Sequence, residues 1–308
     1  MAKNSTNVRK KMARLALRLT GRTLGTLAPE WAAQWGERLF CTPQRTAPSR
    51  TARAVLAQGQ QRFLELCGER VAVWSWGEGP RVLLVHGWSG YGGQLTAFVA
   101  PLVAAGFSVV TFDAPGHGLS SGSRSSLPEL ARVIRAVAHA TGGPHALVAH
   151  SIGAAASALA LHQGLEVERA VLLSPPSDPR KAVAFFSREV ALPGHAVKRM
   201  VARLEARLGR LEDYVVPRFA PALKTPVRIF HDVGDEEVRV ESGEAIAQAW
   251  PGARLVRTQG LGHYRILYTP AVVSEAVAFI TESRPRDAWP LVTAPLAEAA
   301  ATPSLRSA

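Results

Sequence analysis

From about residue 60 onward, the chain alternates short apolar runs with longer segments of helical periodicity. The apolar runs are bounded by glycine, proline or polar turn residues, which is typical of buried strands. The predicted strands are 63–66, 71–76, 82–86, 109–113, 146–150, 170–173, 227–230 and 254–257. The predicted helices of this part are 92–105, 127–141, 152–164, 240–250 and 270–282. This alternation predicts an α/β fold with a mostly parallel sheet, helices on both faces, and a leading hairpin around Gly68-Glu69.

Before residue 60 the pattern is helical. Residues 8–20 place Val8, Met12, Leu15 and Leu19 on one stripe, with basic residues at most other positions. We favour the interpretation that this stripe packs on the protein's own body. A basic amphipathic helix can instead lie on a membrane surface, and an Arg-rich, acid-poor start is also compatible with a targeting segment. A second helix is predicted over 29–40.

An unusual connection separates Pro175 from Pro226, since it shows no strand pattern. It contains two predicted helices, 182–190 and 196–211. Insertions of this size in compact domains are usually functional, so we expect a helical cap above the strand ends. The second helix presents a basic face formed by Arg199, Arg203, Arg207 and Arg210. This face either binds an anionic substrate or, as is more common, is simply solvated.

These patterns divide the chain into four parts. A basic N-terminal helical arm covers 1–59, and the α/β core is formed by 60–175 and 226–283. The helical cap is 176–225. The segment 284–308 is rich in Pro, Ala and Ser and is expected to be a flexible tail.

Composition and charge limit the possible partners. Two cysteines, Cys41 and Cys67, give no disulfide framework or metal cluster, so a reducing, cytoplasmic location is expected. The net charge is +12, and residues 1–53 contribute +9 of it, from eleven Lys or Arg residues against two acids. The arm is therefore the part that could make peripheral contact with an anionic membrane, whereas nothing suggests a nucleic-acid partner. The oligomeric state cannot be deduced from the sequence.

Three candidate catalytic residues follow three of the predicted strands. Ser151 lies between the strand 146–150 and a helix rich in small residues, which is the layout of a nucleophile elbow. Asp235 follows the strand 227–230, and His263 follows the last strand. Because the carboxyl ends of parallel strands form one edge of a sheet, we expect the three side chains to meet there. A serine hydroxyl needs a neighbouring base to act as a nucleophile, and a histidine oriented by an acid supplies one.

Four motifs then identify a family. They are Val85-His86-Gly87-Trp88, Asp113-Ala114-Pro115-Gly116-His117-Gly118, Ala149-His150-Ser151-Ile152-Gly153 and Gly260-Leu261-Gly262-His263. Over roughly residues 70–283 the chain resembles the α/β-hydrolase fold family, in its serine esterase and lipase-like branch. The resemblance implies that Ser151 is the nucleophile, His263 the base and Asp235 the orienting acid. It also implies that the backbone N–H groups of Trp88 and Ile152 form the oxyanion hole.

The sequence departs from the family pattern at two positions. Ala149 stands where a glycine is usual, two residues before the serine. Asp232 also stands where a glycine is frequent, three residues before the acid, so it is an alternative to Asp235. We favour Asp235 because Val238 follows it as in the family's Asp-x-x-Val pattern. His86, Asp113 and His117 are expected to be structural.

The expected function is a metal-independent serine hydrolase acting on a small-molecule carboxylic ester or thioester, through an acyl-enzyme on Ser151. No cofactor is expected, and no metal, because five further histidines lack paired ligand spacing; these are His139, His145, His162, His195 and His231. A serine nucleophile excludes the dehalogenases and epoxide hydrolases of this fold, which need a carboxylate. Three alternatives stay open: carbon–carbon bond hydrolysis, lipid-ester hydrolysis at a membrane reached through the arm, and a catalytically silent binding protein.

Overall fold

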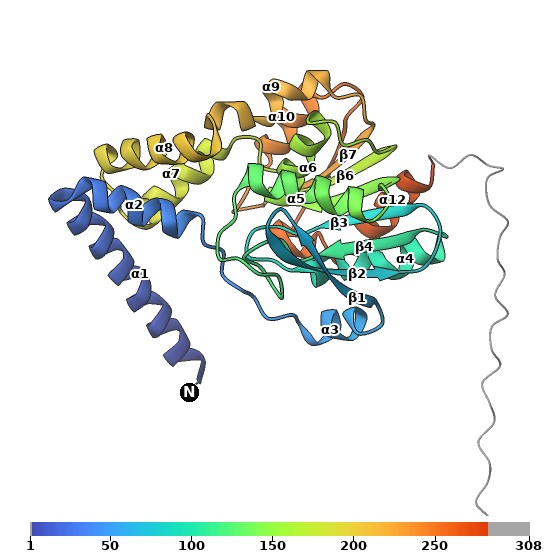
Figure 1. Cartoon of the computed structure of the whole chain (residues 1–308), viewed down its shortest axis with the longest axis horizontal. Coiled ribbons are helices and arrows are strands. Elements are labelled where there is room, and N and C mark those ends of the chain that lie inside the picture. The colour runs from blue at the N-terminus through green and yellow to red at the C-terminus, as the bar shows by residue number, and fades with distance from the viewer. Residues whose placement is uncertain (1, 283–308) are drawn as a thin grey trace, which may run out of the picture.

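The computed structural model describes residues 2–282, and the side chains of residues 11–282; the predicted tail 284–308 lies outside them. In this part of the chain, eight strands form one sheet in the order β1-β2-β4-β3-β5-β6-β7-β8 (Figure 1). The strands are β1 (Gln60–Leu66), β2 (Glu69–Trp76), β3 (Arg81–Val85), β4 (Ser108–Phe112), β5 (Ala146–His150), β6 (Arg169–Leu173), β7 (Val227–Asp232) and β8 (Arg254–Thr258). From β4 to β8 all neighbours are parallel. The prediction of a mostly parallel sheet is therefore confirmed.

The two antiparallel strands form the predicted hairpin at one edge. β1 pairs with β2, and β2 pairs with β4. The turn residues are Cys67 and Gly68, with φ values of 55° and 83°. Two consecutive left-handed residues make the tight turn whose twist suits a hairpin. The turn therefore lies one residue earlier than the predicted Gly68-Glu69.

Helices cover both faces of the sheet, and each face has its own apolar core. On one face α5 (Leu127–Ala140), α6 (Ile152–His162) and α10 (Glu241–Ala249) pack on residues such as Leu83 and Leu147. On the other face α4 (Val99–Ala104) and α12 (Pro270–Thr281) pack on residues such as Leu84 and Val148. The alternation of side chains along each strand supplies these two faces.

Some helices differ from the prediction. The segment predicted as one helix over 92–105 begins as the 3-10 helix η1 (Gly92–Phe98), and Leu95 (φ −105°, ψ 21°) departs from helical geometry before α4 starts. The short helices α3 (Arg50–Leu56) and α11 (Gly262–Arg265) have too few residues to show a helical period and were not predicted. In the insertion, η2 (Leu211–Tyr214), α9 (Val216–Phe219) and η3 (Ala220–Ala222) were missed for the same reason.

The arm and the insertion pack against each other. Figure 1 shows α1 (Ala2–Leu27), α2 (Pro29–Phe40), α7 (Pro179–Glu189) and α8 (Gly194–Leu208) together at one end of the sheet; we call these four helices the lateral lobe. A third apolar cluster holds the lobe together, with Ala32 and Ala33 of α2 against Met200 and Leu204 of α8. Apolar stripes from two distant segments thus form one small core.

The basic face of α8 faces α2 rather than a substrate. Arg199 reaches Glu30 at 3.2 Å, and both Arg203 and Arg207 donate to Glu37, at 3.0 and 3.1 Å. Glu30 and Glu37 are the only two acids of residues 1–53. For Arg199, Arg203 and Arg207 the expectation of a merely solvated face is wrong, because acids about 170 positions away in the sequence pair with them. Arg210 lies beyond the end of α8, pairs with Glu212 and is 70% exposed.

The favoured interpretation of the first helix is also wrong. Met12, Leu15 and Leu19 are 61, 51 and 58% exposed, so the described part of the apolar stripe does not pack on the protein's own body. Instead, α1 contacts the turn between α7 and α8 through the buried Gly21 and Gly25. In the described residues, α1 included, no helix combines the length and the apolar character that crossing a bilayer requires.

Replacing Glu37 by glutamine is expected to lower the free energy of unfolding by about 1–2 kcal/mol, because two guanidinium groups lose a buried carboxylate partner. The side chain of Glu37 is only 9% exposed, whereas that of Glu30 is 60% exposed. Glu30→Gln is therefore the matched control, with an expected loss of about 0.5 kcal/mol or less. Urea-induced unfolding followed by circular dichroism measures both. A larger loss for Glu30→Gln would contradict the prediction.

Candidate active site

Ser151 occupies a strained turn between β5 and α6. Its φ and ψ are 54° and −128°, a conformation that L-residues rarely adopt outside functional turns. Its N–H donates to the carbonyl of Leu173 in β6 at 2.9 Å. Two residues later, a Cβ on Gly153 would lie 2.3 Å from the His86 carbonyl oxygen, so only glycine fits there. The predicted elbow therefore forms because small residues let α6 pack directly behind Ser151.

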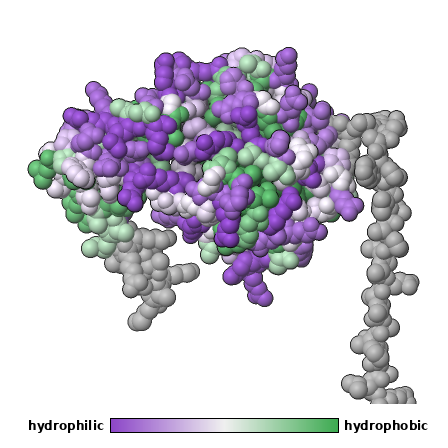
Figure 2. All heavy atoms as spheres, viewed as in Figure 1, coloured by the Kyte–Doolittle hydropathy of each residue, from purple (hydrophilic) through white to green (hydrophobic). Residues whose placement is uncertain are grey.

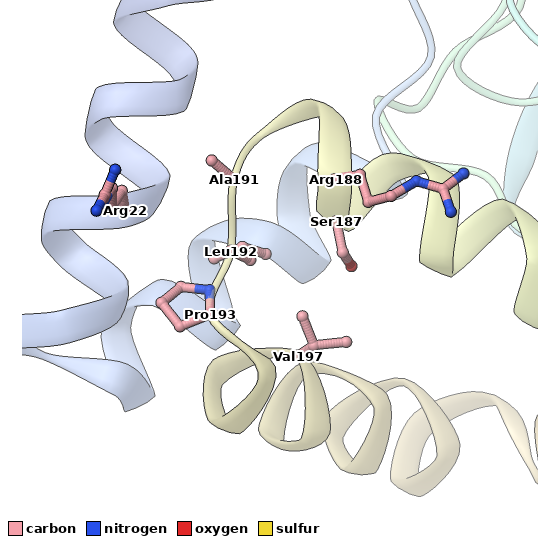
Figure 3. A pocket seen from close by; sticks show the side chains of 7 residues that line it. All are labelled: Arg22, Ser187, Arg188, Ala191, Leu192, Pro193 and Val197. Carbon is pink, nitrogen blue, oxygen red and sulfur yellow. The ribbon is translucent and has the colours of Figure 1, made fainter.

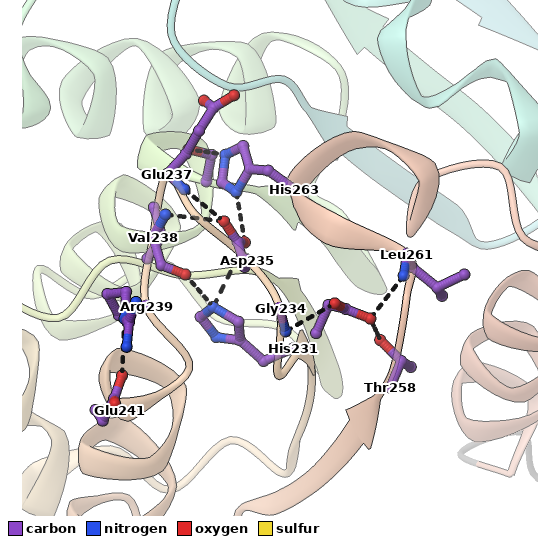
Figure 4. Close-up of polar contacts among 12 residues, drawn as sticks. His231, Gly234, Asp235, Glu237, Val238, Arg239, Glu241, Thr258, Leu261 and His263 are labelled. Atoms are coloured by element: carbon purple, nitrogen blue, oxygen red, sulfur yellow. Dashed lines mark hydrogen bonds and ion pairs between the residues drawn. The ribbon is translucent and has the colours of Figure 1, made fainter.

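The structure brings Ser151, His263 and Asp235 together. Ser151 Oγ lies 3.0 Å from His263 Nε2, and His263 Nδ1 lies 2.7 Å from Asp235 Oδ2. Figure 4 shows the Asp235 carboxylate directed at the His263 ring. Because an ionised carboxylate only accepts hydrogen bonds, Nδ1 carries the proton and Nε2 is free to accept from the serine hydroxyl. The three side chains therefore form a continuous hydrogen-bonded chain.

Asp235 is fixed by the turn that follows it. Its Oδ1 accepts the N–H groups of Glu237 and Val238 at 3.0 and 2.9 Å. His231 Nε2 donates to the carbonyl of Val238 at 2.8 Å and braces the same turn (Figure 4). Burial on its own raises the pKa of Asp235, but the hydrogen bonds from His263 and Val238 outweigh it and hold the pKa below its usual value. Asp235 is thus ionised and aimed at His263.

Asp232, the alternative acid, has a different set of partners. Its Oδ1 accepts the N–H of Gly234 at 3.0 Å, and its Oδ2 accepts from Thr258 Oγ1 and the N–H of Leu261 at 2.9 and 2.8 Å. These bonds tie the end of β7 to the loop that leads from β8 to His263. Burial alone raises its pKa, but the hydrogen bonds from the Leu261 and Gly262 N–H groups bring it below the usual value. Asp232 therefore positions the loop of His263 and does not contact its ring.

The two predicted oxyanion-hole residues lie on the segments that border Ser151. Ile152 is the first residue of α6, where N–H groups have no partner earlier in the helix. Trp88 follows Gly87, and a Cβ on Gly87 would lie 3.0 Å from Ser151 Cβ. His86 fixes this loop, since its Nδ1–H donates to the Gly87 carbonyl at 2.7 Å and its Nε2 accepts the Ala114 N–H at 3.0 Å.

Sequence reasoning missed the contribution of the linker between α2 and α3. The Arg45 guanidinium donates to four backbone carbonyls of the loop after β4, at 2.5 to 2.9 Å; these belong to His117, Gly118, Ser120 and Gly122. The neighbouring Gln44 N–H donates to Ser89 Oγ at 2.9 Å, directly after Trp88. No motif marks these residues, because their partners are backbone groups of distant loops. The linker thus fixes two loops at the edge of the candidate site.

Three buried histidines lie around the site, and all three are neutral. Burial lowers the pKa of His86 to about 4, and those of His117 and His150 to about 3. His150 Nε2–H donates to the backbone carbonyl of His263 at 3.0 Å, and the two rings lie 4.6 Å apart. Within the described residues, no group of three or more His, Cys, Asp or Glu side chains is arranged to hold a metal ion.

Acidification is expected to destabilise the fold between about pH 6.5 and 4. An unfolded histidine has a pKa near 6.5, whereas His86, His117 and His150 stay neutral in the fold to about 4, 3 and 3. Below about pH 6.5 the unfolded state therefore binds more protons, and the free energy of unfolding falls by up to about 1.4 kcal/mol per pH unit for each histidine. The fall stops only when the pH reaches the folded pKa values.

Urea unfolding at about pH 7.5 and pH 5 measures this loss. His139→Gln, at an exposed position near the end of α5, is the control and should keep the full pH dependence. Equal free energies of unfolding at the two pH values would contradict the prediction.

Comparisons with known proteins agree with the fold described above. Residues 82–303 match the alpha/beta hydrolase family. A pimeloyl-[acyl-carrier protein] methyl ester esterase of Aromatoleum aromaticum is 26% identical over an alignment of 236 residues, and the match covers 62% of this chain and 94% of that protein. Among solved structures, an esterase of Pyrococcus furiosus has a TM-score of 0.60 at 18% identity, covering 78% of this chain and 98% of its own. An esterase of Exiguobacterium antarcticum has a TM-score of 0.57 at 16% identity, covering 73% of this chain and 100% of its own.

Proposed function

The chain belongs to the alpha/beta hydrolase family, and from this premise we propose that it hydrolyses carboxylic esters through an acyl-enzyme formed on Ser151. The observation that carries the proposal is the hydrogen-bonded chain from Ser151 through His263 to Asp235, with links of 3.0 and 2.7 Å. A catalytically silent binding protein has no need for these three groups in proton-transfer geometry.

The acylation step uses each group in turn. His263 Nε2 takes the hydroxyl proton of Ser151 as Oγ attacks the ester carbonyl carbon, which becomes tetrahedral. The negative charge on the former carbonyl oxygen is stabilised by the N–H groups of Trp88 and Ile152. The imidazolium then returns its proton to the departing alcohol, and an acyl ester on Ser151 remains. Asp235 stabilises the imidazolium throughout, through its bond to Nδ1.

Deacylation repeats the same steps with water as the nucleophile. His263 removes a proton from the water, the resulting tetrahedral intermediate collapses, and Ser151 Oγ regains its proton as the carboxylic acid leaves. No metal or redox group enters either step. The buried, ionised Asp235 keeps His263 in the tautomer that both steps require.

The substrate class rests on the relatives. The Aromatoleum aromaticum protein is named as a methyl ester esterase, and this supports a carboxylic ester with a small alcohol as the substrate. A thioester and a carbon–carbon bond are the alternatives, since both pass through an acyl group on serine. We favour the ester because the relative is named as an ester hydrolase, and no feature of the described site points to a thioester or to a carbon–carbon bond.

Labelling with a fluorophosphonate probe tests the proposal directly. The intact protein should incorporate the probe, peptide mass spectrometry should place the adduct on Ser151, and methyl or nitrophenyl ester hydrolysis should decline in step with labelling. Protein denatured beforehand is the control and should not react. A native protein that takes no label, or one labelled elsewhere, would contradict the nucleophile. Labelling of Ser151 with turnover of a thioester but of no ester would contradict the substrate class.

A further inference from the structure

The outer face of α1 is apolar and has no partner within the described residues. Met12, Leu15, Leu19 and Leu27 are 61, 51, 58 and 78% exposed. Figure 2 shows hydrophobic residues along this part of the lateral lobe, at the left of the view. Apolar residues exposed singly are common, but a continuous stripe along one helix is typical of an interaction surface.

The opposite face of α1 packs on the rest of the lateral lobe, so the stripe has a defined orientation. About two and a half turns separate Met12 from Gly21, which places them on opposite sides of the helix. A Cβ on Gly21 would lie 1.9 Å from the Val190 carbonyl oxygen, and one on Gly25 would lie 2.3 Å from Pro193 Cδ. Close packing at these two glycines directs the stripe away from the protein.

Polar contacts strengthen this attachment. Arg18 Nη1 donates to the Arg188 carbonyl at 3.0 Å, and Arg14 pairs with Glu189 at 2.7 Å. A hollow remains between α1 and the turn from α7 to α8, lined by Arg22 on α1, Arg188 on α7 and apolar residues that include Leu192 and Pro193 (Figure 3). The junction therefore combines cationic and apolar side chains beside the stripe.

The charge of the arm is not neutralised within the arm. Its two acids, Glu30 and Glu37, pair with the arginines of α8. Of the four described basic side chains on α1, namely Lys11, Arg14, Arg18 and Arg22, Arg14 pairs with an acid, and no such pair is found for the other three. A stripe bordered by unneutralised cations fits an anionic surface.

We propose that α1 docks the protein on an anionic lipid bilayer, with the Met12–Leu15–Leu19 stripe at the boundary of headgroups and acyl chains. The basic side chains beside the stripe bind the anionic headgroups. A second copy of this chain fits the face less well, because pairing through the stripe would bring the same cations close together. The proposal holds whether or not Ser151 is a nucleophile, since its readout is binding.

Co-sedimentation of the full chain with vesicles tests the proposal. Vesicles of phosphatidylcholine with about one third phosphatidylglycerol should bind the protein about tenfold or more tightly than pure phosphatidylcholine vesicles, and raised salt should weaken the binding. The variant Met12→Gln/Leu15→Gln/Leu19→Gln changes only exposed side chains, so it should fold normally and lose binding about tenfold or more. Its circular dichroism spectrum and thermal melt check the fold.

Charge reversal provides the matched comparison. Lys11→Glu/Arg22→Glu should lower binding to the anionic vesicles about tenfold or more. Arg132→Glu/Arg135→Glu makes the same change in net charge on exposed positions of α5 and should leave binding unchanged. Equal losses in both variants, equal binding to neutral vesicles, or no binding by the wild type would overturn the proposal. So would a wild-type dimer in light scattering that becomes monomeric in the glutamine variant, since the stripe would then cover a second copy.

Discussion

Ser151→Ala is expected to abolish ester hydrolysis, with a fall in kcat on the order of 10⁶-fold. The reason is that Ser151 Oγ contacts His263 Nε2 and lies on the strained turn between β5 and α6. Steady-state kinetics with a methyl or nitrophenyl ester measures the fall, and fluorophosphonate labelling should disappear in parallel. The thermal stability should change little, because the partly exposed hydroxyl contributes one hydrogen bond.

Ser157→Ala is the matched control for this prediction. Ser157 lies on the same helix, α6, and its buried hydroxyl has no hydrogen-bond partner, so its removal should leave both activity and labelling unchanged. A Ser151→Ala protein that keeps more than about 1% of the activity would show that another group is the nucleophile. A Ser157→Ala protein that loses activity would show that the helix itself is sensitive to small changes.

Asp235→Asn is expected to lower kcat about 10⁴-fold while leaving the fold intact. The N–H groups of Glu237 and Val238 both donate to Oδ1, so the oxygen of the new amide must occupy this position. Its NH₂ group must then face His263 Nδ1. Nδ1 becomes an acceptor, the ring proton moves to Nε2, and His263 can no longer accept the proton of Ser151. Kinetics and a thermal melt on the same preparation separate the loss of activity from any loss of stability.

Asp232→Asn is the control that distinguishes the two carboxylates. Asp232 accepts hydrogen bonds from Gly234, Thr258, Leu261 and Gly262, and an amide can satisfy only part of them. We expect a loss of about 1–3 kcal/mol in the free energy of unfolding and a fall in kcat far smaller than that of Asp235→Asn. A larger fall in kcat for Asp232→Asn would identify Asp232 as the orienting acid.

The sequence alone predicted most of the framework and the candidate residues of the site. Short apolar runs gave the strands of the sheet, because burial on both faces requires apolar residues at consecutive positions. The small residues around Ser151 gave the elbow, since Gly153 must approach the His86 carbonyl closely. These features are local, so each one leaves its signal within a few neighbouring residues.

Three features were decided only by the tertiary structure. The sequence offered both Asp232 and Asp235 at the end of one strand, and the fold of the 235–238 turn directs Asp235 alone to His263. The arginine face of α8 was open to two interpretations, an anionic-substrate site or a solvated surface, until α2 placed Glu30 and Glu37 against it. The apolar stripe of α1 was expected to be buried, yet the two buried glycines on the opposite face turn it outward.

The physical reason for this division is the range of the interactions. Periodicity, turn chemistry and the need for small residues act between neighbours in the chain, so they determined where strands, helices and the elbow lie. The choice between two carboxylates, the partners of Arg203 and the orientation of α1 depend on contacts between segments far apart in the sequence. Such contacts are determined by how the whole chain packs, and one sequence does not encode them in any local pattern.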